Sequence, residues 1–386
     1  MKKRLKMYSV IACLMAVMTA FTMLVGGCAT SVAEDGTPDT SLEAKEAAME
    51  NGSGEEGEGV VAYCGLTLQS FFFYVEEMGV RKGAEALGMT LLTSNAELDA
   101  AAQTTQMENY ITQGVDVLVI DAVDSEGITD TINKAKDQGI YTVAVDTPIT
   151  MGNVDIGVRL DDVQAASICA EYIVEDLIEK YGEPKGKVVQ CVGRQTSQGC
   201  RNRKTGFDEV MEKYPDIEVI DIMSETPTDA HNNLCNVLST DPDIDALYAY
   251  TDSLSESLVE ALQKNNRWAK RGEEDHVTFV GIDGSSYFLN QIKEGYFDAS
   301  SVQDGACFGE LALELLGEYT MQGKEIPLGT YENDKYAWEE CEIVQTDAGP
   351  VAMIPGYLCT IDNVDDPKHW ANRAVSEWGM DPNVGG

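Results

Sequence analysis

Short apolar runs alternate with amphipathic stretches along most of this chain. The run Val115–Ile120 is followed by apolar residues at helical spacing and then by a second apolar run, Ile140–Val145. Gly139 stands where the C-cap of the intervening helix is expected. A strand, a helix and a strand within about 30 residues match the size of one βαβ unit. This pattern predicts two neighbouring parallel strands.

The same alternation continues on both sides of this unit. Strands are expected to begin near positions 60, 89, 115, 140 and 154, and a second series begins near 187, 217, 246, 277 and 298, with helices in between. Such alternation predicts the α/β class, with parallel, doubly wound sheets in two similar domains. Residues 323–353 are less regular, Ile354–Thr360 fits a strand, and a terminal helix is expected from Asp366.

Carboxylates follow both strands of the first unit, at Asp121 and Asp146. In open α/β sheets, ligands bind beyond the carboxyl ends of the strands. Asp146 is therefore the first candidate for a ligand contact. It also precedes a Thr-Pro pair, so a turn or helix-cap role stays open.

The N-terminus has the pattern of an export signal. Residues 1–27 combine a basic start with the apolar stretch Val10–Val25, as in a secretory signal peptide. The segment ends Gly-Gly-Cys28 and resembles the bacterial lipobox, so Cys28 is expected to carry lipid; an ordinary cleaved signal and an uncleaved anchor are the alternatives. Residues 28–58 are acidic and of low complexity, which predicts a disordered tether. The protein is then expected at the outer face of a bacterial cell membrane, held only by the lipid.

The net charge argues against nucleic acid as a partner, and the placement of the cysteines indicates whether they form disulfides. A net charge of −39 repels phosphate backbones, so nucleic acid is not expected as a partner. Eight cysteines follow Cys28, none in a C-x-x-C pair, and most lie within apolar strand or helix patterns. Buried thiols are therefore expected for most of them. Cys341 with Cys359 is the first pair to consider for a disulfide.

Signals of catalysis are weak. The three histidines, His231, His276 and His369, lie far apart without metal-ligand spacing. No G-x-S-x-G motif occurs, and no G-x-G-x-x-G motif follows the first strand. We therefore expect no catalytic residue, no cofactor and no metal site, and a binding protein rather than an enzyme.

A series of motifs in a fixed order carries a family resemblance. They are TLQSFFF (67–73), GVDVLVIDAVDS (114–125), GIYTVAVDT (139–147), GCRNRKTGF (199–207), ALYAYTD (246–252), TFVGIDG (278–284) and SSVQD (300–304). Over about 59–322 the chain resembles the bacterial type I periplasmic sugar-binding proteins, the ribose-binding-protein-like group, in lipoprotein form. The resemblance implies two Rossmann-like lobes, 59–160 with 304–350 and 161–303 with 351–386. Three hinge crossings near Leu160, Gln303 and Ile354 would join them.

The resemblance also implies a function. A monomeric protein of this kind captures a monosaccharide or a similar small polar ligand between its lobes and delivers it to the membrane permease of an ABC importer. A sensory or chemotaxis role and a non-sugar ligand such as a nucleoside are the alternatives. Sugar-responsive repressors share the two-lobe core, but they need a basic DNA-binding domain where this chain has a signal and an acidic tether.

Carried over by position, the implied ligand contacts come from both lobes. Carboxylates accept hydrogen bonds from hydroxyls, a guanidinium donates them, and aromatic rings stack on the apolar face of a sugar. Core packing for the aromatics, capping for the aspartates and surface exposure for the arginine are the structural alternatives. Thr147 and Thr251 replace an Arg and an Asn common in ribose binders, which leaves other pentoses, hexoses or modified sugars open. The expected contacts are Ser70, Phe72, Phe73, Asp146, Arg201, Thr251, Asp252, Asp283 and Gln303.

Overall fold

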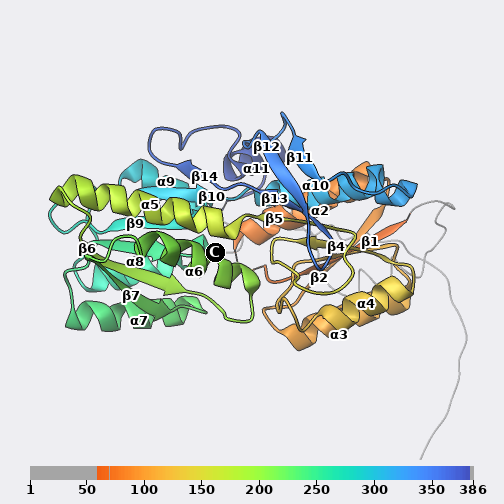
Figure 1. Ribbon diagram of the computed structural model, residues 1–386, viewed down its shortest axis with the longest axis horizontal. Helices are drawn as coiled ribbons and strands as arrows, with labels where there is room; N and C mark the ends of the chain where they lie inside the picture. The colour runs from red at the N-terminus through yellow and green to blue at the C-terminus, as the bar shows by residue number, and fades with distance from the viewer. Residues whose placement is uncertain (1–58, 69, 383–386) are drawn as a thin grey trace, which may run out of the picture. The chain divides into compact units, whose positions relative to one another are not determined.

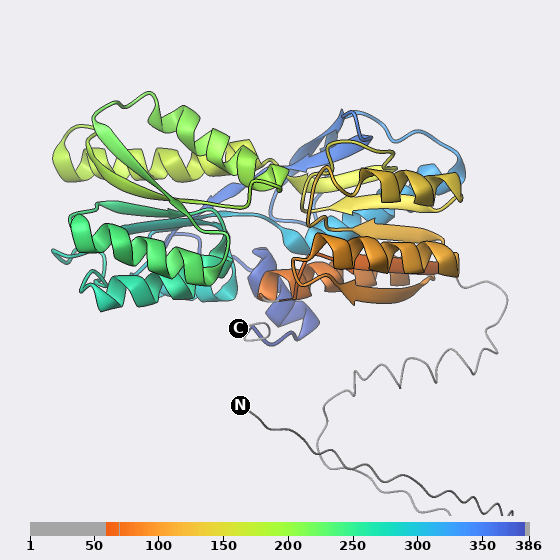
Figure 2. The same ribbon diagram turned by 90° about the horizontal axis from the view of Figure 1, so that it is seen from below.

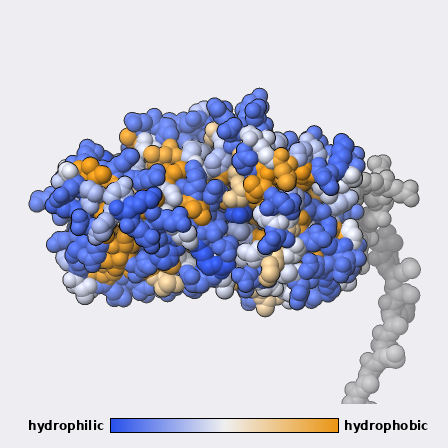
Figure 3. All heavy atoms as spheres, viewed as in Figure 1, coloured by the Kyte–Doolittle hydropathy of each residue, from blue (hydrophilic) through white to orange (hydrophobic). Residues whose placement is uncertain are grey.

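The computed structural model describes residues 59–68 and 70–382. The signal peptide, the lipidation site Cys28 and the tether predicted from the sequence lie outside this part of the chain. Within it, no helix combines the length and the apolar character needed to cross a bilayer. On the face drawn in Figure 3, hydrophilic residues cover most of the described surface and apolar residues form small, separate patches.

The first sheet has eight strands in the order β11-β12-β13-β5-β4-β3-β1-β2. The pairs β11–β12 and β12–β13 are antiparallel, and the other neighbours run parallel. Its strands are β1 (Val60–Gly65), β2 (Thr90–Asn95), β3 (Val117–Ile120), β4 (Tyr141–Val145), β5 (Ile156–Leu160), β11 (Gly329–Glu332), β12 (Glu340–Gln345) and β13 (Pro350–Ile354).

The second sheet has six strands in the order β14-β10-β9-β8-β6-β7, all parallel except the β10–β14 pair. Its strands are β6 (Gly186–Val192), β7 (Ile217–Met223), β8 (Ala246–Ala249), β9 (Thr278–Asp283), β10 (Ala299–Val302) and β14 (Tyr357–Cys359). The expected α/β class with mostly parallel sheets is thus confirmed.

Helices cover both faces of each sheet (Figures 1 and 2). On the first sheet, α2 and α10 pack on one face and α3 and α4 on the other, because alternate strand residues point to opposite cores. The helices are α2 (Phe71–Ala86), α3 (Ala100–Gln113), α4 (Thr129–Asp137), α5 (Asp162–Tyr181), α6 (Gln198–Met211), α7 (Pro227–Thr240), α8 (Ser255–Lys264), α9 (Ser286–Glu294), α10 (Gly305–Glu318) and α11 (Trp370–Trp378).

Glycines let α2 and α10 approach closely. A Cβ atom on Gly79 would lie 2.5 Å from the carbonyl oxygen of Ala306, and one on Gly309 would lie 2.3 Å from the backbone nitrogen of Val80. Any larger side chain would force the two backbones apart. This contact holds the middle of α2, whose first turn carries the aromatic run, against α10.

Side-chain caps set the starts of two helices, and one segment is more regular than the sequence indicated. Helix α3 begins at Ala100, because the Asp99 side chain caps it by accepting hydrogen bonds from two backbone N–H groups. Helix α6 begins at Gln198, because the Ser197 side chain caps it by accepting a hydrogen bond from the backbone N–H of Cys200. Residues 323–353, expected to be irregular, contain the antiparallel strands β11 and β12 and the start of β13.

The chain passes between the sheets after β5, after β10 and between β13 and β14. Strand β13 pairs with β5 in the first sheet, so the boundary expected after residue 350 falls inside this strand. Helix α11, expected in the second lobe, contacts α2 and α10 of the first.

Cys341 and Cys359, the first pair to consider for a disulfide, do not form one. Cys341 lies in β12 of the first sheet and Cys359 in β14 of the second, and both are free. The other six cysteines after Cys28 are also free thiols, four of them buried. Buried cysteine packs as a small apolar residue, which agrees with the sequence expectation for most of them.

Candidate ligand-binding site

The carboxyl ends of strands from both sheets surround one cavity of about 140 Å³. Asp146 follows β4 of the first sheet, and Asp283 ends β9 of the second. Thr251 follows β8, and Gln303 lies at the crossing after β10. This is the edge at which open α/β sheets bind ligands.

Arg203 on α6 occupies the centre of a buried polar network at this cavity. Its Nε donates to Asp162 Oδ1 at 2.8 Å, and its Nη1 donates to the carbonyl oxygen of Tyr250 at 2.7 Å. Its Nη2 donates to Gln303 Oε1 at 3.3 Å, and Nη1 lies 3.6 Å from Asp283 Oδ1. Burial lowers the pKa of Arg203, but the surrounding carboxylates raise it more, so the guanidinium stays charged.

Asp283 is held on every side by neighbouring groups. Its Oδ2 accepts hydrogen bonds from Thr251 Oγ1 at 2.7 Å and from the backbone N–H of Asp252 at 2.9 Å. Its Oδ1 accepts one from Gln303 Nε2 at 2.5 Å. The carboxylate therefore has a set orientation toward the cavity before any ligand arrives.

Both strand-end aspartates have unusual backbones. Asp146 has φ +52° and Asp283 φ +121°. Positive φ is uncommon outside glycine, and such strain concentrates at binding and catalytic sites. The two residues occupy equivalent places in the two sheets. The same backbone strain is therefore found at both strand ends that border the cavity.

Aromatic residues at the start of α2 line the cavity and also pack against other aromatic rings in the core. Phe72 and Phe73 line the cavity. Phe72 also packs edge-on against Phe73, with ring centroids 5.3 Å apart, and against Trp370, at 5.5 Å. Ser70, before the run, lines the cavity too, and its hydroxyl makes no capping hydrogen bond to α2.

Seven of the nine expected contacts line this cavity, and two do not. Arg201 is turned toward Gln198 and Glu126, with Nη2 distances of 2.5 and 3.3 Å. Asp252 is buried behind the cavity wall, where its Oδ2 accepts the backbone N–H of Ser285 at 2.6 Å. The seven are Ser70, Phe72, Phe73, Asp146, Thr251, Asp283 and Gln303.

Arg203 replaces Arg201 in the cavity because of helix periodicity. Arg203 shares the buried face of α6 with Gly199, Gly206 and Phe207, whereas Arg201 does not. The sequence carried this signal, since Arg203 stands four residues before Phe207. Besides Arg203, sequence reasoning missed other residues that line the cavity, among them Asp162, Arg194, Cys200 and Tyr250.

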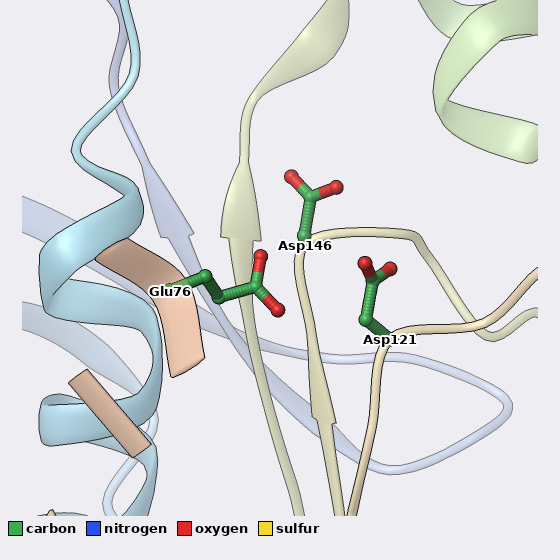
Figure 4. A group of neighbouring side chains, drawn as sticks. All are labelled: Glu76, Asp121 and Asp146. Atoms are coloured by element: carbon green, nitrogen blue, oxygen red, sulfur yellow. The ribbon is translucent and has the colours of Figure 1, made fainter. Parts of the chain in front are cut away.

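Three carboxylates converge behind the first-lobe wall of the cavity. One oxygen from each of Glu76, Asp121 and Asp146 lies within 4.8 Å of the others (Figure 4). Burial raises the pKa of all three, to about 7 for Asp121, and the charge of Asp121 raises the pKa of Glu76 and Asp146 further. The sequence did not point to this group as a unit, because each residue comes from a different element.

Comparisons with known proteins agree with this architecture. The family model for the periplasmic binding protein domain matches residues 61–325. The ribose import binding protein of Bacillus subtilis strain 168 is 27% identical over 287 residues, which cover 74% of this chain and 89% of that protein. The xylitol-binding protein of Mycolicibacterium smegmatis is 29% identical over 246 residues, covering 62% and 67% of the two chains.

Solved structures show the same fold. A carbohydrate transporter solute-binding protein from Agrobacterium radiobacter, in complex with D-arabinose, superposes with a TM-score of 0.67 at 19% identity. The match covers 82% of this chain and 99% of that one. Together with the family match over more than half of its length, this shows that the chain belongs to the periplasmic binding protein family, as the order of its motifs led us to expect.

Proposed function

We propose that this chain captures a monosaccharide or a closely related polyol in the cavity between its two sheets and delivers it to an ABC importer. The observation that carries this proposal is the meeting of strand-end carboxylates from both sheets, Asp146 and Asp283, around the charged Arg203. Carboxylate acceptors, a guanidinium donor and the Phe72 and Phe73 rings match the hydroxyls and the apolar face of a sugar. The relatives named for ribose and xylitol support the same ligand class.

The mechanism we propose is closure of two lobes on the ligand. The ligand contacts residues from both sheets, so it binds the closed arrangement more tightly and shifts the population toward it. The membrane permease then recognises the closed form. Lipid attachment at Cys28 and a monomeric state complete this proposal, the first supported by the Gly-Gly-Cys sequence at the end of the signal-like segment.

A thermal-shift screen of the purified full chain tests the proposal. Monosaccharides, polyols, sugar acids and nucleosides are compared at equal concentration. A ligand present at 100 times its Kd stabilises the fold by about 2.7 kcal/mol, which raises the melting temperature measurably. If only nucleosides raise the melting temperature, the fold assignment stands but the proposed sugar function is refuted.

Asp283→Asn then tests the site itself. The amide keeps the shape of the side chain but removes a charge that accepts hydrogen bonds from hydroxyls. Affinity for the sugar found in the screen is expected to fall by about 1–3 kcal/mol, roughly 5- to 150-fold, in isothermal titration. Asp243→Asn, an exposed acid in the same lobe, is the control and should bind as the wild type does. Unchanged affinity in Asp283→Asn would remove Asp283 from the site.

A further inference from the structure

The group formed by Glu76, Asp121 and Asp146 is built from three separate elements. Glu76 lies on α2, Asp121 follows β3 and Asp146 follows β4. Figure 4 shows the Glu76 side chain extending toward Asp121 and Asp146, whose carboxylates point the same way. Only Asp146 lines the cavity, so the other two approach the same point from behind its wall.

Each of the two buried members has one oxygen held by a protein donor and one without a partner. Tyr63 Oη donates to Glu76 Oε1 at 2.8 Å, and the Thr147 backbone N–H donates to Asp121 Oδ1 at 3.3 Å. The other oxygens, Glu76 Oε2 and Asp121 Oδ2, are buried and accept no hydrogen bond, although both residues are 0% exposed. A buried acceptor without a partner costs folding free energy. A cation bound between these two oxygens would remove that cost.

The charges of Arg194 and Arg203 act on Asp121 and Asp146 but do not outweigh burial, so the pKa of both carboxyls stays raised. Among the described residues, no ion pair joins a basic side chain to Glu76, Asp121 or Asp146. Arg203 already forms ion pairs with Asp162 and Asp283. Two buried carboxylates and a partly buried one so close together cannot all stay ionised without a counter-charge.

We propose that Glu76, Asp121 and Asp146 bind a hard divalent cation, with Ca²⁺ as the best-suited ion. Carboxylate oxygens are the ligands that such ions prefer, and Ca²⁺–oxygen distances of about 2.3–2.6 Å let one ion bridge oxygens up to about 4.8 Å apart. The Tyr63 and Thr147 donors orient the ligating carboxylates, as outer-shell groups do in metal sites. Sequence spacing did not reveal this site, since its members lie 45 and 25 residues apart.

The position of Asp146 gives the cation a second role. Ca²⁺ takes 6–8 oxygen ligands, and three carboxylates leave coordination positions open on the side of the cavity. Neighbouring hydroxyls of a sugar or polyol fit these positions. This second step rests on the proposed function, whereas the cation site rests on the three carboxylates alone.

Titration of the metal-free protein with Ca²⁺ tests the site without any sugar. The full chain is stripped with a chelator, and its melting temperature is measured with CaCl₂, MgCl₂ or MnCl₂. At saturating Ca²⁺ the melting temperature should rise by about 5 °C. Glu76→Gln, which keeps the Tyr63 partner but loses the charge, should abolish the rise. Glu85→Gln, an exposed acid on the same helix, should keep it.

Two results would overturn the cation site: no shift with any of the three ions, or the same shift in Glu76→Gln as in the wild type. If Glu76→Gln fails to fold by circular dichroism, Asp121→Asn takes its place in the comparison. The sugar step has its own readout, the affinity of the sugar found in the screen with Ca²⁺ and with chelator. A fall of tenfold or more with chelator supports it, and equal affinity refutes it while leaving the metal titration to stand alone.

Discussion

Two arginines on helix α6, Arg201 and Arg203, differ in burial and in the groups that they contact. Arg203 is 8% exposed and joins Asp162, Tyr250 and Gln303 across the cavity, while Arg201 contacts groups near the surface. Both arise from the same motif, and both carry the same charge. The difference between them is the face of α6 on which each one stands.

Arg203→Ala should destabilise the protein strongly. Removing Arg203 leaves Asp283 without its counter-charge and Asp162 with only Arg159, 3.9 Å away, and breaking such a buried ion pair costs about 3–5 kcal/mol. Urea denaturation measures this loss. Arg201→Ala is the matched control, and its cost should stay within about 0.5 kcal/mol. Equal losses in the two variants would contradict the roles given to them.

Strands β9 and β10 of the second sheet are joined by a polar group far from the cavity. Asp298, at the start of β10, accepts the backbone N–H of Phe279 at 2.8 Å. It also contacts His276 Nε2 at 3.1 Å and a guanidinium nitrogen of Arg271 at 2.5 Å. Burial lowers the pKa of His276, but the hydrogen bond and charge of Asp298 outweigh it, so the pKa is raised overall.

The protonated His276 ring should therefore stabilise the fold. A raised pKa gives a contribution that is complete below the unfolded value of about 6.5 and is lost as pH rises through the folded value. The free energy of unfolding lost in His276→Gln should be larger at pH 6 than at pH 8, as measured by urea denaturation. His369 gives the opposite sign, since burial lowers its pKa and favours the neutral ring. Equal losses at both pH values would rule out this role for His276.

The C-terminal segment ties the two sheets together. After β14 in the second sheet, the chain returns to α2 and α10 of the first through α11. Trp370, fully buried, stacks against Phe71 at 5.8 Å and donates its Nε1–H to the carbonyl oxygen of Asp283 at 2.6 Å. One side chain thus contacts the aromatic run of one lobe and a strand-end aspartate of the other.

Trp370→Phe should weaken both stability and ligand binding. The smaller ring leaves a cavity and removes the donor to the Asp283 carbonyl, at a cost of about 2–3 kcal/mol. Sugar affinity should fall as well, because the strained backbone at Asp283 loses its support. Denaturation and isothermal titration measure the two effects. Trp378→Phe, at the half-buried end of α11, is the control. If Trp370→Phe lowers the stability but leaves the sugar affinity unchanged, Trp370 does not support the binding site.

Local patterns in the chain were enough to predict the alternation of strands and helices, the α/β class and the aspartates at strand ends. These features depend on apolar periodicity and on caps, which act over a few residues. The same reasoning made Asp146 the first candidate for a ligand contact, because ligands bind at the carboxyl ends of parallel strands. Asp283 and Gln303 were expected at the cavity from the family resemblance.

Other features depended on contacts between distant segments. The convergence of Glu76, Asp121 and Asp146, the choice of Arg203 over Arg201 and the return of α11 to the first sheet follow from strand order and helix packing. Cys341 and Cys359 stay free for the same reason, since they lie in different sheets. Contacts between side chains from distant segments depend on strand order and helix packing. Periodicity along the chain reflects only neighbours a few residues apart, so it does not predict these contacts.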